Sequence, residues 1–104
     1  IETNAKGFGG ICDAIVTPSP GQITFPIMSR LCGPGLVVSE AQALRAMGLA
    51  WQRLKVVAEP GGAVALAAAL FRATQIEGDT VICTISGGNV DQTMFTRALD
   101  TLAD

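Results

Sequence analysis

The 104-residue sequence contains no histidine, and its seven lysines and arginines are spread along the chain. The missing histidine excludes the serine-hydrolase triad, which needs an imidazole base. Scattered positive charge argues against a nucleic-acid-binding surface. The three cysteines, Cys12, Cys32 and Cys83, form no C-x-x-C pair, which argues against a zinc site. An odd number of isolated cysteines predicts reduced thiols in a cytoplasmic protein.

Long apolar runs are also lacking. The longest, Gly61–Phe71, is about half the length that a membrane span needs, and no basic segment precedes it as in a signal peptide. A hydrophobic content of 49% is enough for one core, so we expect a single domain over residues 1–104. The opening "IETNAKGFGG" is polar, rich in glycine and lacks an initial methionine, which suggests a fragment of a longer chain.

Apolar runs and turn residues divide the chain into alternating elements. We predict strands at 12–17, 36–39, 55–58 and 81–85, and helices at 22–31, 40–55, 60–71 and 92–102. Ser39 with Gln42 forms a capping box, and Asp91 is a suitable N-cap for the last helix. The unbroken apolar run Val81–Ile85 is typical of a parallel strand covered on both faces. The sequence therefore predicts an α/β fold, a parallel sheet flanked by helices.

Two of the predicted helices have apolar surfaces of different kinds. One carries a single apolar stripe, which we interpret as core, formed by Leu44, Met47, Trp51 and Leu54. The alanine-rich helix that follows Pro60 is apolar nearly all round, so we expect it to be buried. Gly61 and Gly62 at its start each cost about 1 kcal/mol relative to alanine in a helix. Another segment should therefore approach closely at that point.

Polar residues follow two of the predicted strands. Ser86, Gly87 and Gly88 end one strand, and Glu59 ends another. Ligands of open α/β sheets bind outside the carboxyl ends of the strands, so these residues form a candidate site. Each also has a purely structural interpretation, because Ser86 could satisfy a local turn and Glu59 could cap its helix.

Two glycine-rich motifs have no ligand-binding signature. "KGFGG" lacks the preceding strand and the G-x-G-x-x-G spacing of a dinucleotide site, and "SGGN" is not followed by the G-K-[ST] of a phosphate loop.

The pair "LKVVAEPGGAVALAAAL" and "GDTVICTISGGNVD" resembles the C-terminal third of the catalytic region of threonine/serine dehydratases. These are fold-type II enzymes with a tryptophan synthase β-like fold that depend on pyridoxal 5'-phosphate, and serine racemase belongs to the same group. The segment from Ile1 to Leu44 is similar to the family sequence just before these motifs, so the resemblance covers nearly the whole chain.

The resemblance implies a role for each candidate residue. Ser86 matches the serine whose hydroxyl bonds the pyridine nitrogen of the cofactor. Glu59 matches an acidic residue near the ring, and Gly87 and Gly88 match the turn that admits the ring edge. The implied reaction is β-elimination, which converts a hydroxy amino acid into a 2-oxo acid and ammonia.

Other parts of the family site have no counterpart here. Neither Lys6 nor Lys55 stands in the context of the Schiff-base lysine, and the glycine loop for the cofactor phosphate is missing. The divalent-metal ligands of some members would precede Ile1. We therefore expect that this chain alone is inactive, contains no catalytic residue and binds no cofactor.

The leading interpretation is that the chain forms one wall of the cofactor site of a dehydratase, which acts on L-threonine or L-serine. Two alternatives remain: a stand-alone, non-catalytic domain that acts by self-association, and a racemase or a dehydratase of another hydroxy amino acid. We expect no nucleic-acid or membrane partner. A sheet and a helix that need covering predict a homodimer or higher oligomer, with Val81–Ile85 or Gly61–Phe71 near the interface.

Overall fold

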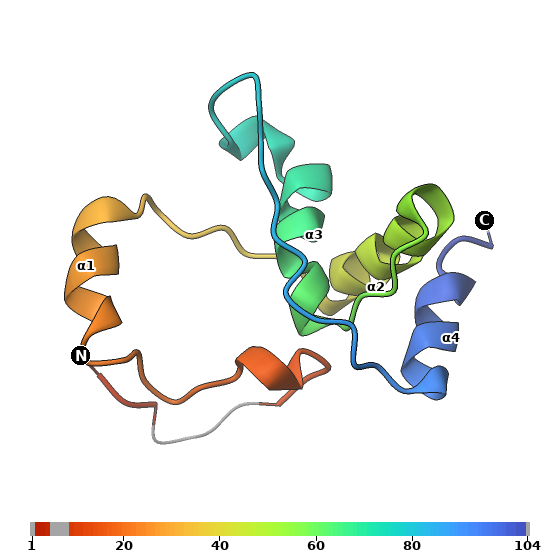
Figure 1. The fold of residues 1–104 in the computed structure, drawn as a ribbon, viewed down its shortest axis with the longest axis horizontal. Coiled ribbons are helices and arrows are strands. Elements are labelled where there is room, and N and C mark those ends of the chain that lie inside the picture. The colour runs from red at the N-terminus through yellow and green to blue at the C-terminus, as the bar shows by residue number, and fades with distance from the viewer. Residues whose placement is uncertain (1, 5–8, 104) are drawn as a thin grey trace.

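The computed structural model describes residues 2–4 and 9–103 of the chain. Figure 1 shows four α-helices, namely α1 (Thr24–Leu31), α2 (Glu40–Leu49), α3 (Val64–Phe71) and α4 (Gln92–Asp100). Short 3-10 turns lie at Asp13–Ile15 (η1), Gly61–Ala63 (η3) and Ala73–Gln75 (η4), and a π-helical turn, Ala50–Leu54 (η2), continues α2. The predicted helices are therefore all present.

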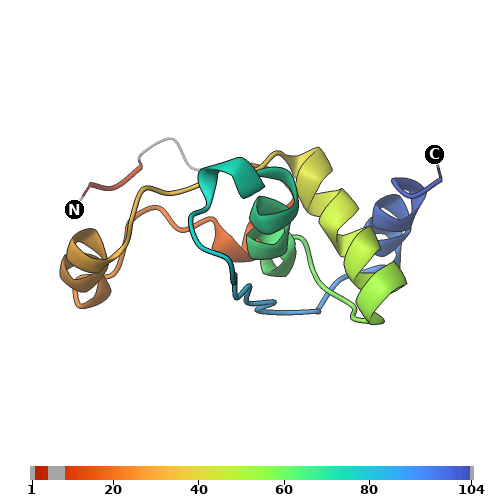
Figure 2. The same cartoon turned by 90° about the horizontal axis from the view of Figure 1, so that it is seen from above.

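The core lies where α2 packs between α3 and α4. Figure 2 shows the three helices side by side. Met47 is fully buried in this core, and the other completely buried members of the cluster are alanines, which lets the helices approach closely: Ala46, Ala58, Ala63, Ala67 and Ala98. The interior is therefore thin, and one large side chain fills its centre.

Both predicted N-caps are confirmed. The Ser39 hydroxyl accepts a hydrogen bond from the Gln42 nitrogen at 3.1 Å, and the Gln42 side chain accepts one from the Ser39 nitrogen at 3.0 Å. Asp91 accepts a hydrogen bond from the Met94 nitrogen at 2.7 Å at the start of α4. Each cap satisfies amides that have no partner inside the helix.

The predicted apolar stripe is only half buried. Leu44 and Met47 are in the core, but Trp51 is 40% exposed and Leu54 is 58% exposed. These two residues lie in the π-helical turn, whose wider winding breaks the 3.6-residue period on which the stripe depends. Trp51 instead packs edge-on against Phe95, with ring centroids 6.0 Å apart.

No segment within residues 2–4 and 9–103 forms a regular strand. The strand prediction at 12–17 is wrong, because residues 13–15 form the 3-10 turn η1. The segments 36–39, 55–58 and 81–85 also lack strand structure, since a strand needs a hydrogen-bonded neighbour along its length. The predicted parallel sheet is not confirmed.

The α3 helix is less buried than its composition predicts. Ala67 is its one fully buried residue, and Leu70 on its outer side is 45% exposed. The preceding 3-10 turn η3 is buried throughout. The helix is therefore covered at its start and open along one face.

The α1 helix stands apart from the core in Figure 1, at the end of two extended connections. None of its residues is buried.

The chain exposes 7419 Å², whereas a compact monomer of 10.7 kDa exposes about 5,500 Å². The molecule is thus much more open than a typical domain. None of the helices described is long and apolar enough to cross a membrane.

Candidate functional site

The candidate site lies where two segments distant in the sequence cross. The Glu59 nitrogen donates a hydrogen bond to the Gly87 carbonyl oxygen at 2.9 Å. A Cβ atom added to Gly62 would lie 2.5 Å from the same oxygen, and one added to Gly88 would lie 2.5 Å from the Val57 carbonyl oxygen. Such contacts leave no room for a side chain. The predicted close approach at Gly62 is therefore confirmed, and its partner is the turn after Ser86.

Glu59 and Gly87 are in contact at this crossing. A Cβ atom at Gly87 would collide with the Glu59 carboxylate oxygen Oε1. Within the described residues, no hydrogen bond joins the Glu59 carboxylate to the start of η3. The carboxylate lies over the turn instead, and this places a negative charge beside Ser86.

Ser86 itself is exposed, in an extended segment. None of the hydrogen bonds of residues 2–4 and 9–103 involves its hydroxyl. The structure therefore does not support its interpretation as a residue that satisfies a local turn.

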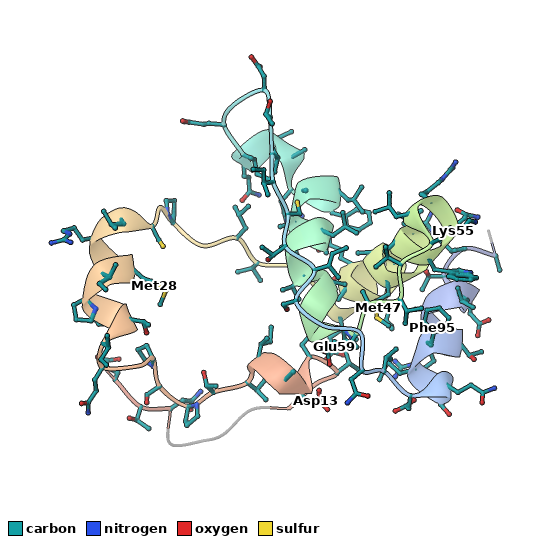
Figure 3. The ribbon with its side chains drawn as sticks, in the orientation of Figure 1. Asp13, Met28, Met47, Lys55, Glu59 and Phe95 are labelled. Carbon is teal, nitrogen blue, oxygen red and sulfur yellow. The ribbon has the colours of Figure 1, made fainter. Side chains whose placement is uncertain are left out.

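The 3-10 turn η1 also belongs to this region, which the sequence did not predict. Ile15 and Ala14 lie against Gly61, at 3.3 Å and 3.7 Å from the position of an added Cβ atom. Asp13 and Glu59 line one small cavity of about 60 Å³ together with Asn89 and Asp91. Figure 3 shows Asp13 and Glu59 at the same end of α3. Asp13 falls in the segment 12–17, whose predicted strand gave no reason to place it there.

The small cavity does not fit the cofactor itself. Pockets that bind cofactors and other small-molecule ligands measure about 300–1,000 Å³. The cavity beside Glu59 is much smaller and holds at most small molecules such as water. Among the described residues, no group of three or more Cys, Asp or Glu residues has the geometry to bind a metal ion.

Lys55, the lysine that the structure describes, lies away from this rim. The Lys55 ammonium donates to the Gln52 carbonyl oxygen at 3.0 Å and lies 5.8 Å from the Trp51 ring centroid. Lys55 is labelled in Figure 3 at the outer end of the α2 helix, away from Glu59. Lys6 and most of the "KGFGG" motif lie outside the described residues.

Comparisons with known proteins identify the same family that the two sequence motifs at the crossing resemble. A family profile described as pyridoxal-phosphate dependent enzyme matches residues 2–87. The chain is 37% identical over 92 residues to a serine racemase of Dictyostelium discoideum, which covers 86% of this chain and 28% of the relative. It is 33% identical over 95 residues to an L-threonine ammonia-lyase of Thermotoga maritima, which covers 91% of this chain and 23% of the relative.

The name of a third relative gives a different substrate, L-threo-3-hydroxyaspartate. The chain is 38% identical over 81 residues to an L-threo-3-hydroxyaspartate ammonia-lyase of a Pseudomonas species, covering 78% of this chain and 25% of that protein. The chain thus spans about a quarter of the length of the curated relatives it matches.

Proposed function

The chain belongs to the family of pyridoxal-phosphate dependent enzymes, and on this premise we propose that it supplies one wall of the cofactor site of a threonine/serine dehydratase. The observation that carries the proposal is the crossing of residues 57–62 with residues 86–88. At this crossing Glu59 contacts Gly87, the residue after Ser86, although Glu59 and Ser86 are 27 positions apart in the sequence.

We propose a distinct role for each residue of the rim. The Ser86 hydroxyl bonds the pyridine nitrogen, and because it is neutral it does not hold a proton on that nitrogen as a carboxylate would. Gly87 and Gly88 keep the wall flat beside the ring edge. Glu59 acts through its charge and by its contact with Gly87, which fixes the turn that carries Ser86. Bound pyridoxal phosphate supplies an electron-withdrawing ring that stabilises negative charge on the substrate.

We further propose that residues 55–58 and 81–85 become neighbouring strands of a parallel sheet in the complete enzyme. The hydrogen bond from the Glu59 nitrogen to the Gly87 oxygen joins the chain just past the ends of both segments, which supports this proposal. Residues 1–104 then form one unit of the catalytic region. Val81, Ile82 and Val57, which are 48%, 91% and 44% exposed here, would be covered by that sheet and its helices.

The proposed substrate is a small hydroxy amino acid, L-threonine or L-serine, and the reaction is β-elimination of water. Two relatives are named as ammonia-lyases of hydroxy amino acids, which supports this class. A third is named as a serine racemase, so racemisation of the same substrate class is the second candidate reaction. Pyruvate and 2-oxobutanoate formation, measured beside loss of optical activity, separates the two.

We propose that the chain by itself does not bind the cofactor covalently, because Lys55 lies away from the rim and neither Lys6 nor Lys55 stands in the sequence context of the family's Schiff-base lysine. Titration of the 104-residue chain with pyridoxal phosphate, followed by absorbance and by borohydride reduction with mass spectrometry, tests this. We expect no saturable change beyond slow labelling of exposed amines. Stoichiometric labelling of Lys6 or Lys55, lost on substitution of that lysine by alanine, would overturn the proposal.

The role of Ser86 is testable in the full-length product of the gene. Loss of one hydrogen bond costs about 0.5–1.5 kcal/mol, so Ser86→Ala should weaken cofactor binding and turnover by about 2- to 13-fold. Ser29→Ala is the matched control, because Ser29 is an exposed serine on α1. Equal cofactor affinity and turnover in both variants would show that Ser86 has no role in the site.

A non-catalytic function has one observation in its favour. The large exposed apolar surface would suit a stand-alone domain, derived from such an enzyme, that acts by self-association. The mass of the natural gene product discriminates between the two functions. A product roughly three times the length of this chain supports the dehydratase, and a product of this length supports the stand-alone domain.

A further inference from the structure

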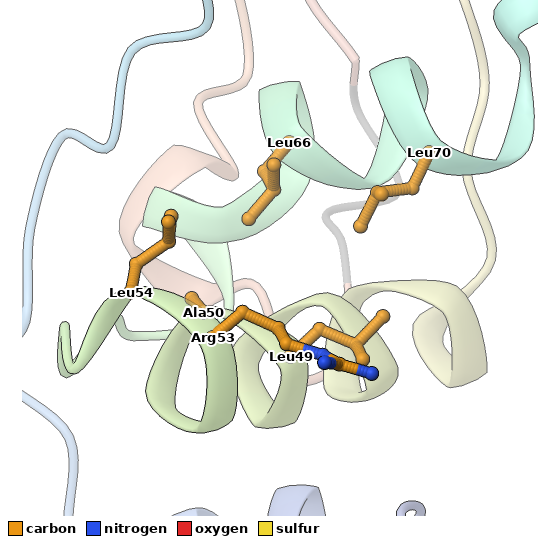
Figure 4. A pocket seen from close by; sticks show the side chains of 6 residues that line it. All are labelled: Leu49, Ala50, Arg53, Leu54, Leu66 and Leu70. Carbon is orange, nitrogen blue, oxygen red and sulfur yellow. The ribbon is translucent and has the colours of Figure 1, made fainter.

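The two ends of α2 have different surroundings. Toward its carboxyl end, an apolar groove of about 340 Å³ lies between α2 and α3, and Figure 4 shows the side chains that line it: Leu49, Ala50, Arg53, Leu54, Leu66 and Leu70. At its amino end, the carboxylate of Glu40 contacts residues 10 and 11. This second contact links α2 to the segment that contains η1.

The Glu40 carboxylate is fitted to the backbone of that segment. Its oxygen Oε1 accepts a hydrogen bond from the Ile11 nitrogen at 3.0 Å. A Cβ atom added to Gly10 would collide with the same oxygen. Gly10 also has a φ of 109°, which glycine adopts far more readily than residues with a side chain. The glycine therefore permits the turn of the backbone and leaves room for the carboxylate.

The bond to Glu40 is the polar link between residues 9–17 and the helical core. Within the described residues, no other hydrogen bond joins this segment to α2, α3 or α4. A cavity of about 380 Å³, which Cys12 and Glu40 both line, lies between the segment and the connection at 36–39. The Ile11 side chain packs against the core. The segment is thus held by this side chain and by the Glu40 carboxylate, with open space beside them.

The segment that Glu40 holds is in contact with the crossing of the candidate site. The turn η1 packs against η3, and Ile15 lies 3.3 Å from the position of a Cβ atom added to Gly61. The next residue, Gly62, meets the backbone of Gly87. Because η3 touches both η1 and the turn that contains Gly87, a displacement of η1 removes one of the two supports of η3.

The same segment also reaches the cavity beside Glu59. Ile11 and Asp13 both line that cavity, whereas Glu40 does not. We propose that Glu40 is a positioning residue of the cofactor site, which holds residues 10–15 against η3 and so keeps the Glu59 side of the crossing in place. The inference rests on the proposed function, since it assigns Glu40 to the support of that site. Glu40 acts through the segment and touches no bound ligand.

Two substitutions separate the hydrogen bond of Glu40 from its charge. Glu40 stands in the first turn of α2, where a negative charge stabilises a helix. Glu40→Gln keeps an acceptor on a side chain of the same length and removes the charge. Glu40→Asp keeps the charge but is one methylene shorter, so it does not reach the Ile11 nitrogen. Glu77→Asp is the matched control, because Glu77 is exposed and lies outside residues 9–17.

Hydrogen exchange in the full-length product of the gene measures the hold on the segment directly. Mass spectrometry follows the peptide that contains residues 9–15. Glu40→Asp should exchange about 2- to 13-fold faster there, which is the effect of losing one hydrogen bond on a local opening equilibrium. Glu40→Gln and Glu77→Asp should exchange as the unmodified protein does.

Labelling of Cys12 with iodoacetamide is an independent measurement of the same hold. Burial raises the pKa of the Cys12 thiol, and the charges of Glu40 and Asp13 raise that pKa further. Because Glu40→Asp keeps the charge, faster labelling of Cys12 in this variant reports a loss of burial. We expect this faster labelling in Glu40→Asp and the unmodified rate in Glu77→Asp.

Cofactor affinity tests the link from the segment to the site. We expect Glu40→Asp to weaken binding of pyridoxal phosphate to the cofactor-free protein by up to about 13-fold, and Glu40→Gln to restore the affinity. Turnover at saturating cofactor should change less than the affinity, because Glu40 touches no reacting atom. Thermal unfolding shows whether each variant remains folded.

Three results would overturn the inference. The first is unchanged exchange of residues 9–15 in Glu40→Asp. The second is faster exchange with unchanged cofactor affinity, which would limit Glu40 to a structural role. The third is an equal loss of affinity in Glu40→Gln and Glu40→Asp, which would make the charge or another property of Glu40 responsible. Failure of the proposed function has another signature: the unmodified gene product binds no pyridoxal phosphate, while exchange in the Glu40 variants still follows the hydrogen bond.

Discussion

The core formed by α2, α3 and α4 and the separate α1 helix, which we call the arm, contain similar apolar residues. These residues are buried in the core and exposed on the arm. Met47 on α2 has no exposed surface, whereas Met28 on α1 is 46% exposed. Both helices carry apolar residues at helical spacing; α2 begins at Glu40 as the sequence predicts, and α1 begins at Thr24, two residues later than predicted. The difference is that alanines at the contact faces let α2, α3 and α4 approach one another, while α1 is held at a distance by extended connections. Apolar composition therefore makes burial favourable, but the position of the helix decides whether it occurs.

The test with the largest expected effect removes Met47, the largest fully buried side chain of the core. Met47→Ala should lower the free energy of unfolding by about 2–5 kcal/mol, because it leaves a cavity among residues too small to fill it. Met28→Ala on the arm is the matched control and should change stability by less than about 0.5 kcal/mol. Urea unfolding monitored by circular dichroism measures both. Equal losses would mean that α1 is also packed.

A second test adds one methyl group at the crossing of the two site segments. Gly62→Ala should destabilise the chain by about 1–3 kcal/mol, since the new Cβ atom would meet the backbone of Gly87, which cannot rotate away. Gly35→Ala, in the connection between α1 and α2, is the control, because nothing lies within 4 Å of its Cβ position. Thermal unfolding compares them. A neutral Gly62→Ala would show that the crossing is loose.

A third test concerns the end of a core helix. Asp91→Ala removes the side chain that accepts from the Met94 nitrogen and should cost about 1 kcal/mol. Asp91→Asn keeps an acceptor in the same place and should restore most of the loss. Because α4 packs against α2, the loss should appear in the unfolding of the whole core. If alanine and asparagine behave alike, the cap does not contribute.

The smallest expected effect is a difference in labelling rate between two cysteines, partly buried Cys12 and exposed Cys32, which directly follows α1. Burial raises the pKa of the Cys12 thiol, and the nearby Glu40 and Asp13 carboxylates raise that pKa further. A higher pKa means less reactive thiolate near neutral pH. We expect iodoacetamide to label exposed Cys32 several-fold faster than Cys12 near pH 8, followed by peptide mass spectrometry. The reverse order would contradict the burial of Cys12.

The sequence by itself determined the helices, their caps and the family. Local interactions carry this information: the capping box of Ser39 and Gln42 spans four residues, and the Asp91 cap also reaches only three positions ahead. It also indicated that a close approach occurs at Gly62, because a glycine pair at the start of a helix is unfavourable unless something requires it.

Only the tertiary structure decided which segments meet. It paired Gly62 with the turn after Ser86, brought Asp13 to the same region, and rotated Trp51 and Leu54 out of the expected stripe through a π-helical turn. Among residues 2–4 and 9–103, it also left Val81–Ile85 without a neighbouring strand and α1 without a partner helix. The physical reason is that caps and helices are stabilised by neighbours in sequence, whereas sheets and buried faces depend on contacts with distant segments. Where such a segment is not in place, an apolar run stays extended and exposed.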